Sequence, residues 1–263
     1  MLILIAESKT MKTVEQAVSP SEFSEHRPAG EKTAAEIIDS LRDLTVGELA
    51  ERLKLSGSLA VKMQKMIYEF PNKALGLKSI EAFTGVVFQA LDFATLSAEA
   101  RSRCLRDTRI ISSLYGWLRP DDIVKPYRLD FNTKIELHPD EPNSEKALFG
   151  IQRSKVSVEL VNTLNQSLEK EILDLLPGDA AKCVDWKLTK RFAKVWKVDF
   201  VELQESGARK TPAANKLKKM RGLLLRQILQ EDIRDIATLR HVSSPHYLCE
   251  GTPIFPNHLS FLC

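Results

Sequence analysis

The chain has 263 residues and a formal net charge of +3 at pH 7, and 43% of its residues are hydrophobic and 28% charged. These values are those of a soluble globular protein that is long enough for one large domain or two small ones. No stretch approaches the roughly 20 apolar residues of a membrane span, and the N-terminal apolar run lacks the basic region of a signal peptide. We therefore expect a cytoplasmic protein with no membrane partner.

Four cysteines are widely spaced and form no C-x-x-C pair: Cys104, Cys183, Cys249 and Cys263. This spacing indicates reduced thiols in a cytosolic protein and not a disulfide framework. His246 and Cys249 are three residues apart, but a zinc site needs a second such pair. There is also no Walker-type or G-x-G-x-x-G loop. We expect neither a metal nor a cofactor.

The first predicted element is a strand. Residues 2–5 form a continuous apolar run of strand length, which indicates a central strand. Residues 6–13 follow as a polar loop with Lys9 near its middle. Strand ends are frequent site positions in α/β folds. Lys9 is therefore either a site residue or one more solvated lysine.

Three helices are predicted next. An apolar stripe predicts a helix over residues 31–41, and a capping box from Thr45 to Glu48 predicts another that ends near residue 53. A tight turn with Gly57 at its centre precedes a third helix over residues 60–70. The pattern over residues 45–70 resembles a helix-hairpin-helix unit.

A helical hairpin of this kind presents backbone N–H groups and a positive helix dipole to a phosphate. Such contacts fix the position of a nucleic-acid backbone and carry no base information. The alternative is a plain helical hairpin that packs on the core. The candidate DNA contacts here are Ser56, Gly57, Ser58, Lys62 and Lys65.

The densest group of site-like residues lies at residues 112–131, after an apolar run that predicts a short buried strand. Pro120 and Pro126 disfavour regular structure, and Gly116 permits a conformation or a close approach that other residues resist. A rigid loop that follows a strand is a common way to build a site. A structural turn or an ion-pair network would have the same sequence. The candidate pocket residues are Lys9, Tyr115, Arg119, Tyr127, Arg128 and Asp130.

The remaining pattern predicts alternating helices and strands. We expect a strand or turn at 83–88, helices at 97–105, 154–176 and 212–228, and strands at 133–137, 183–184 and 200–203. Between residues 207 and 226 there are seven Lys or Arg and no acid. This charge exceeds what a solvated face needs and favours contact with phosphates. The candidates are Lys216, Lys218, Lys219 and Arg221.

Three stretches resemble the YaaA peroxide-stress protein family of bacteria. They are S-x-L-Y-G-x-L-R-P-x-D-x-x-x-P-Y-R-L-D at residues 112–130, the opening strand with Ser8-Lys9-Thr10, and K-K-x-R-G at residues 218–222. The resemblance implies a mixed α/β fold over residues 1–263, as a single compact domain with a small mixed sheet covered by helices. It also implies that the helix-hairpin-helix unit lies inside this domain and contacts DNA.

Two positions depart from the family pattern. Val86 stands where the family usually has an acid, and residues 185–197 carry cations in place of a polar N-x-x-S-x-E-Y-like segment. We expect both departures to lie on the rim of the pocket.

Two main functional hypotheses follow. The first is a DNA-binding protein of the peroxide-stress response that holds double-stranded or structured DNA with little sequence specificity. The second is an enzyme of undefined reaction that acts on nucleic acid or a nucleotide-like small molecule. In it Asp130 would be the general base, and Lys9 a nucleophile or electrostatic stabiliser. A small-molecule sensor that uses the same pocket is a third possibility.

Overall fold

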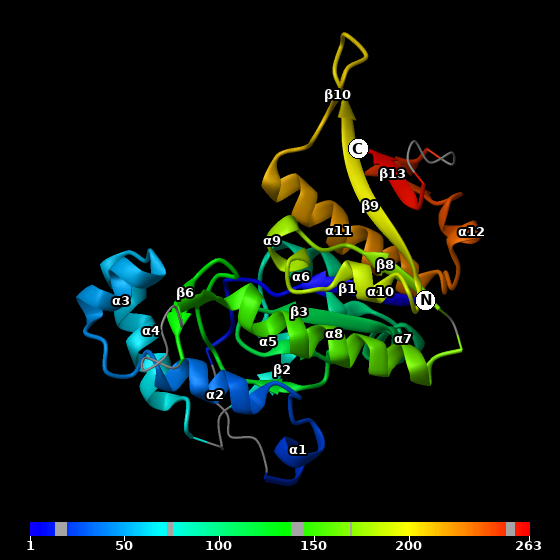
Figure 1. Ribbon diagram of the computed structural model, residues 1–263. Coiled ribbons are helices and arrows are strands. Elements are labelled where there is room, and N and C mark those ends of the chain that lie inside the picture. The colour runs from blue at the N-terminus through cyan, green and yellow to red at the C-terminus, as the bar shows by residue number, and fades with distance from the viewer. Residues whose placement is uncertain (14–19, 73–75, 138–144, 169, 251–255) are drawn as a thin grey trace.

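A mixed sheet forms the centre of the molecule (Figure 1). The structure is a computed structural model that describes residues 1–13, 20–72, 76–137, 145–168, 170–250 and 256–263. Within these residues the main sheet has nine strands in the order β11-β12-β13-β9-β8-β1-β3-β4, with β10 paired to β9. The run from β13 to β3 is parallel, and antiparallel strands flank it on both sides. The mixed α/β class is confirmed.

The strands are β1 (Leu2–Ala6), β2 (Leu77–Lys78), β3 (Thr108–Ser112), β4 (Gly116–Leu118), β5 (Ile123–Val124), β6 (Lys134–Glu136), β7 (Glu145–Ala147), β8 (Glu171–Asp174), β9 (Lys194–Leu203), β10 (Arg209–Lys210), β11 (Ser243–Ser244), β12 (Tyr247–Cys249) and β13 (His258–Leu262). Two pairs lie outside the main sheet, namely β2 with β5 and β6 with β7.

The helices are α1 (Pro20–Glu25), α2 (Glu31–Asp39), α3 (Val46–Leu53), α4 (Gly57–Glu69), α5 (Ser79–Ala82), α6 (Val86–Leu91), α7 (Ala98–Asp107), α8 (Leu148–Gln166), α9 (Gly178–Ala181), α10 (Trp186–Thr189), α11 (Ala214–Gln230) and α12 (Ile236–Leu239), with a short 3-10 helix η1 (Phe93–Thr95).

Strand β1 shows why apolar clusters lie on both faces of the sheet. All five of its residues are buried, and alternate side chains of a strand point to opposite faces. Ile3 and Ile5 join the cluster that includes α6, α7 and α11, whereas Leu2 and Leu4 join the cluster that includes α8. The predicted central strand is confirmed, because β1 pairs with β8 on one side and β3 on the other.

The helix predicted over residues 154–176 is wrong in its second half. Helix α8 ends at Gln166, and the next apolar residues form strand β8, in which Ile172 pairs with Leu2 of β1. A short run of Ile and Leu is compatible with a strand that is buried on both faces, and it is equally compatible with the buried face of a helix. Periodicity therefore did not separate the two elements.

Two other short segments also differ from the prediction, which was a strand or turn at 83–88 and a strand at 183–184. Residues 83–88 contain the start of α6, whose first turn is closed by a hydrogen bond of 2.9 Å from the Phe88 N–H to the Gly85 carbonyl. Residues 183–184 form a turn between α9 and α10. The helix predicted over 212–228 is confirmed as α11, and the strand predicted over 200–203 is the second half of β9.

Helices α3 and α4 form a helical hairpin at the left of Figure 1. The capping box is present, since the Thr45 hydroxyl accepts from the Glu48 N–H at 3.3 Å and the Glu48 carboxylate accepts from the Thr45 N–H at 2.8 Å. The turn differs from the prediction, because Gly57 is the first residue of α4 and Lys54 takes the left-handed conformation with φ of 53°.

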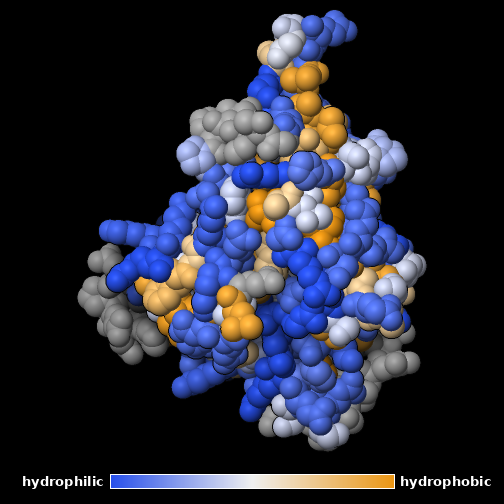
Figure 2. All heavy atoms as spheres, turned by 90° about the vertical axis from the view of Figure 1, so that its right-hand side faces the viewer, coloured by the Kyte–Doolittle hydropathy of each residue, from blue (hydrophilic) through white to orange (hydrophobic). Residues whose placement is uncertain are grey.

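The C-terminal part of the described chain extends the sheet. Strand β13 lies parallel to β9, and β12 and β11 follow as antiparallel neighbours. Cys249 is buried in β12 while His246 is exposed before it. Figure 2 shows the face that carries these strands, where polar residues surround an apolar strip that descends from the β9–β10 hairpin.

Across the described residues, no helix combines the length and apolar character needed to cross a bilayer.

Gly222 sets the distance between α11 and α6. A Cβ atom added at Gly222 would lie 2.2 Å from the Val87 carbonyl oxygen and 2.7 Å from the Ala90 Cβ. We expect Gly222→Ala to force the helices apart and lower the free energy of unfolding by about 1–3 kcal/mol, as overpacked cores do. Chemical denaturation measures this change.

Gly150→Ala is the matched control. Gly150 lies in the first turn of α8, and an added Cβ would have nothing within 4 Å. Alanine there should raise the free energy of unfolding by about 0.5–1 kcal/mol because it favours helix. Equal effects of the two substitutions would contradict the close approach of α6 and α11.

Candidate functional site

The candidate site lies at the carboxyl ends of the parallel strands β1, β3 and β8. Three loops leave the sheet at this edge: residues 7–13 after β1, the segment that runs from β3 to residue 131, and residues 175–177 after β8. The carboxyl edge of a parallel sheet is where ligands of open α/β folds bind. The sequence pattern placed Lys9 and the stretch at residues 112–131 on two of these loops.

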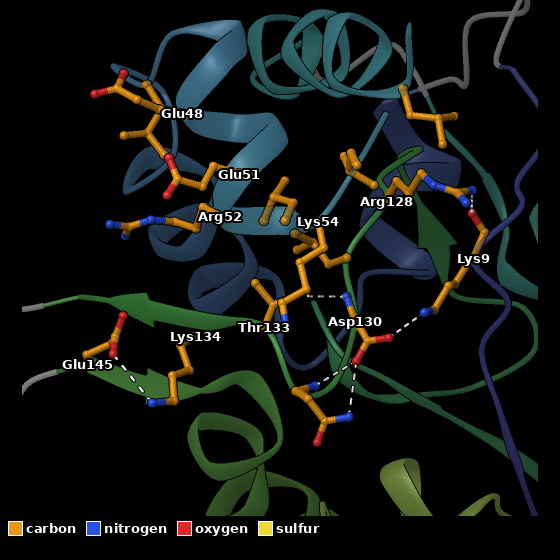
Figure 3. A pocket seen from close by; sticks show the side chains of 16 residues that line it. Lys9, Glu48, Glu51, Arg52, Lys54, Arg128, Asp130, Thr133, Lys134 and Glu145 are labelled. Carbon is orange, nitrogen blue, oxygen red and sulfur yellow. Dashed lines mark hydrogen bonds and ion pairs between the residues drawn. The ribbon is translucent and has the colours of Figure 1, made fainter. Parts of the chain in front are cut away.

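Lys9 and Asp130 form an ion pair between two of the loops (Figure 3). The Arg128 guanidinium donates to the Lys9 backbone carbonyl at 2.8 Å. This hydrogen bond gives the loop after β1 a second contact with the segment around residue 130. Partial burial acts to raise the pKa of Asp130, but hydrogen bonds from Lys9 and Asn132 outweigh it, so this pKa lies below its usual value. Asp130 is therefore ionised at neutral pH and has a cationic partner.

A groove of about 870 Å³ separates this ion pair from the helical hairpin. We call it the hairpin groove. Its walls come from α3, the turn after α3, the loop around residue 130 and the β6–β7 pair, and its charged residues are Lys9, Glu48, Glu51, Arg52, Lys54, Arg128, Asp130, Lys134 and Glu145. Figure 3 shows the hairpin side chains on one side of the opening, and Lys9, Asp130 and Lys134 on the other.

A second cavity, of about 320 Å³, lies directly at the ends of β1 and β8. We call it the sheet-edge cavity. It is lined by residues 5–10, 85–87 and 129–131, and by Leu175, Pro177, Asp179, Lys218 and Arg221. Lys9, Leu129 and Asp130 line both the cavity and the hairpin groove. The two spaces therefore meet at the ion pair.

A buried hydrogen-bond chain lies beside the sheet-edge cavity. The Tyr127 hydroxyl donates to the Glu7 carboxyl group, and it is 2.7 Å from the Ser112 hydroxyl. Ser112 in turn accepts from the backbone N–H of Tyr115 at 2.9 Å. Burial raises the pKa of Glu7 to about 7, although hydrogen bonds from Ser113, Tyr127 and Ser112 act to lower it.

Glu7 was not among the site residues predicted from the sequence. It is the first residue after a strand that is buried on both faces, and its backbone N–H still donates to Ile111 of β3 at 2.9 Å. A carboxyl group that directly follows a central strand was the available signal, because such a position is at the sheet edge and close to the core.

The other predicted pocket residues divide into two groups. Tyr127 and Tyr115 are buried beneath the site, where the Tyr115 hydroxyl accepts from the Lys125 N–H at 3.1 Å. Arg119 lies elsewhere, because its guanidinium donates to Asp122 at 2.9 Å and lines neither the groove nor the cavity. The pocket therefore brings together Lys9, Arg128 and Asp130 without Arg119.

Helix α11 contributes cations to the cavity but not all of those predicted. Lys218 and Arg221 line it, whereas Lys216 pairs with Glu202 at 2.7 Å on β9. Burial lowers the pKa of Arg221, and the carboxylates of Asp174 and Asp179 act in the opposite direction. In the described chain, no hydrogen bond or close ion pair engages Lys218 or Lys219.

The hairpin cations are also of two kinds. Lys65 lies 3.6 Å from Glu69 on the next turn of α4, whereas Lys62 has no such partner among the described residues. Leu59 lines the groove, and Lys62 follows it by three residues on the same side of the helix. At the start of α4 the Ser56 side chain is 3.3 Å from the Ser58 hydroxyl and does not cap the helix.

Comparison with known proteins decides the family. Residues 1–251 match the sequence profile described as peroxide stress protein YaaA. The chain belongs to the YaaA family. Relatives include UPF0246 proteins of Crocosphaera subtropica (29% identical, with 94% of each chain covered), of Ruegeria pomeroyi (27%, with 100% of this chain and 98% of the relative) and of Francisella philomiragia (26%, with 94% of each). The expected family membership is confirmed.

The two departures from the YaaA pattern lie at opposite edges of the sheet. Val86 lines the sheet-edge cavity, as expected. Residues 190–194 instead line a shallow depression with Lys170, beside the amino ends of β8 and β9. The expectation that this segment borders the pocket is wrong, because it precedes β9 and the site lies beyond the other end of the parallel strands.

Within the described chain, no three His, Cys, Asp or Glu side chains are grouped as metal ligands.

Glu7 makes stability depend on pH. Its folded-state pKa of about 7 is above the ordinary value of 4.5, so its contribution to stability is fully present below about pH 4.5 and is lost as pH rises through 7. Glu7→Gln should therefore raise the free energy of unfolding relative to the parent at pH 8 more than at pH 5, by on the order of 2 kcal/mol. Denaturation at the two pH values measures this.

Tyr127 and Cys183 beside Glu7 do not titrate in the same range. Asp174 of β8, whose pKa burial raises to about 6, does so in the parent and the variant alike. Tyr127 has a pKa raised well above its ordinary value, by burial and by Glu7, and burial raises the pKa of the Cys183 thiol to about 12. Asp130→Asn is the control, because the lowered pKa of Asp130 leaves it ionised throughout. An unchanged pH dependence in Glu7→Gln would show that another group titrates.

Proposed function

We propose that this YaaA-family protein is a DNA-binding protein of the bacterial peroxide-stress response. It holds duplex or branched DNA through backbone phosphates, with little sequence specificity. The family description supports the link to peroxide stress. The charges around the hairpin groove support the contact with phosphates.

The observation that carries the proposal is a set of cations that line the groove and, among the described residues, form no ion pair with an acid. Arg52 lies near Glu48 on the same helix but makes no hydrogen bond to it. In the described chain, no hydrogen bond or ion pair engages the side chains of Arg52 or Lys54 on the hairpin wall. On the opposite wall, Arg128 donates to the Lys9 carbonyl, which leaves its charge uncompensated. Phosphates attract such cations, and guanidinium groups bind them in a bidentate manner.

Most acids of the groove already have partners. Glu48 is held in the capping box, Asp130 by Lys9, and Glu145 lies 3.7 Å from Lys134. A carboxylate that is paired or capped repels a phosphate less than a free one does. Glu51 is without such a partner among the described residues. Among the acids that line the groove in the described chain, Glu51 is therefore the one whose charge is left to repel a polyanion.

A second set of cations continues the path beyond the ion pair. Lys218 and Arg221 of α11 line the adjoining sheet-edge cavity, and Lys219 is exposed beside them. A phosphate chain in the groove that passes Lys9 would reach these cations next. The proposed contacts of Lys65 and Lys216 are weaker, because each has an intramolecular carboxylate partner.

Arg52→Ala/Lys54→Ala tests the proposal. Removing two phosphate contacts should weaken duplex binding for all sequences alike and make the plot of log affinity against log salt shallower by about 2. Fluorescence anisotropy with two unrelated duplexes and a branched DNA at several salt concentrations measures both effects.

Lys190→Ala/Arg191→Ala is the matched control, since it removes the same charge at the opposite sheet edge. Its salt dependence should equal that of the parent. No binding by the parent at low salt, or equal losses in both double variants, would refute binding in the hairpin groove.

A second candidate function is an enzyme that acts on nucleic acid or a nucleotide-like small molecule. It is favoured by the position of the Lys9–Asp130 pair, which lies where the groove and the sheet-edge cavity meet. In this function Asp130 is the general base and Arg128 orients the substrate. Arg119 has no part in it.

Asp130→Asn tests whether Asp130 contributes to DNA binding. The substitution removes a negative charge and releases Lys9, so DNA affinity should be unchanged or higher in a binding assay. A large loss of affinity would mean that Asp130 holds the loop in its DNA-binding conformation. Comparison of thermal unfolding with the parent would then reveal the structural role.

A further inference from the structure

The sheet-edge cavity has the chemistry of a site for a flat ligand with apolar faces. Its volume of about 320 Å³ is at the small end of the usual range for ligand sites, roughly 300–1,000 Å³. Much of its wall is apolar, with Ile5 and Leu175 on the sheet side, Val86 and Val87 on α6, and Phe131 on the loop. A small inorganic anion would leave these walls in contact with water.

Polar side chains line separate parts of the cavity. Besides Glu7 and the α11 cations, they are Ser8, Lys9, Thr10, Asp130 and Asp179. Glu7 lines it from the strand end and is anchored from behind by the Tyr127 hydroxyl, while Lys218 and Arg221 line it from α11. A carboxyl group that titrates near neutral pH can donate or accept a hydrogen bond. The cavity thus offers a carboxyl group at the strand end, apolar walls, and a pair of cations on α11.

The cavity opens toward the hairpin groove. Lys9, Leu129 and Asp130 line both spaces. A strand whose phosphates follow the groove would pass this opening. Enzymes and binding proteins that examine single bases turn them out of the stack into such pockets, and read the polar edge by hydrogen bonds.

We infer that the sheet-edge cavity receives a nucleobase, with Glu7 hydrogen-bonded to its polar edge and Lys218 and Arg221 facing the attached phosphate. A nucleobase is flat, has apolar faces and carries its polar groups on its edge, which matches the separation of groups in the cavity. The base comes from a DNA strand in the hairpin groove or from a free nucleotide. The first source rests on the proposed function, and the second does not.

The strand source is tested with an oligonucleotide that carries one 2-aminopurine, a base whose fluorescence rises when it leaves the stack. Binding of the parent protein should raise this fluorescence, both in single strands and at a mismatch in a duplex. Val86→Trp fills the cavity from the half-buried first residue of α6 and should abolish the rise. The oligonucleotide should still bind, with an affinity measured by anisotropy that falls only by the contribution of the base, because the groove contacts remain.

The free-nucleotide source is tested by calorimetry with the common nucleoside 5′-monophosphates. Binding by the parent should weaken about tenfold in Glu7→Gln, since a hydrogen bond to a charged group contributes about 1.5 kcal/mol. Arg52→Ala/Lys54→Ala should bind these nucleotides as the parent does, because the two residues line only the groove. Circular dichroism and thermal unfolding verify that each variant is folded.

The outcomes separate this inference from the proposed function. Nucleotide binding without oligonucleotide binding supports the base site and refutes binding in the groove. Oligonucleotide binding with no rise in fluorescence, together with no nucleotide binding, overturns the base site while groove binding stands. A folded Val86→Trp that keeps both the fluorescence rise and nucleotide binding overturns it as well.

Discussion

The hydrogen bond from Tyr127 to Glu7 joins the two segments that the candidate site depends on. Glu7 directly follows a strand buried on both faces, and its partly buried carboxyl group lies at the edge of the sheet against Tyr127. Burial of a carboxyl group without partners is strongly unfavourable. Tyr127 and Ser112 at the end of β3 satisfy it, and in doing so they fix the loop that carries Arg128 and Asp130 above the end of β1.

The same loop also holds the helical hairpin. The Arg128 N–H donates to the Met63 sulfur at 3.3 Å, and the Lys125 ammonium donates to the Phe70 carbonyl at the end of α4. Lys9 and Asp130 then tie the loop to the turn after β1. One segment therefore positions both walls of the hairpin groove. A groove whose walls share one anchor is preorganised for a ligand, which lowers the conformational entropy that binding must overcome.

Sequence patterns predicted the features with local causes. Strand β1, the Thr45–Glu48 capping box and the cationic helix α11 each have a signal within a few residues, and each is present. Two failures depended on long-range contacts and one on a local pair. Residues 171–174 form a strand because β1 and β9 flank them. Arg119 lies outside the pocket because it pairs with Asp122, only three residues further along the chain. The role of Glu7 depends on Tyr127, which is 120 residues away in the chain.

The central claim is that DNA phosphates occupy the hairpin groove of this YaaA-family protein. Hydrogen–deuterium exchange on the intact protein, with and without a duplex at low salt, tests it most directly. If phosphates occupy the groove, DNA binding should slow amide exchange at residues 52–60 of the hairpin and at residues 128–136 of the opposite wall. Protection confined to residues 187–197 at the other edge of the sheet, or no protection with saturating duplex, would contradict it.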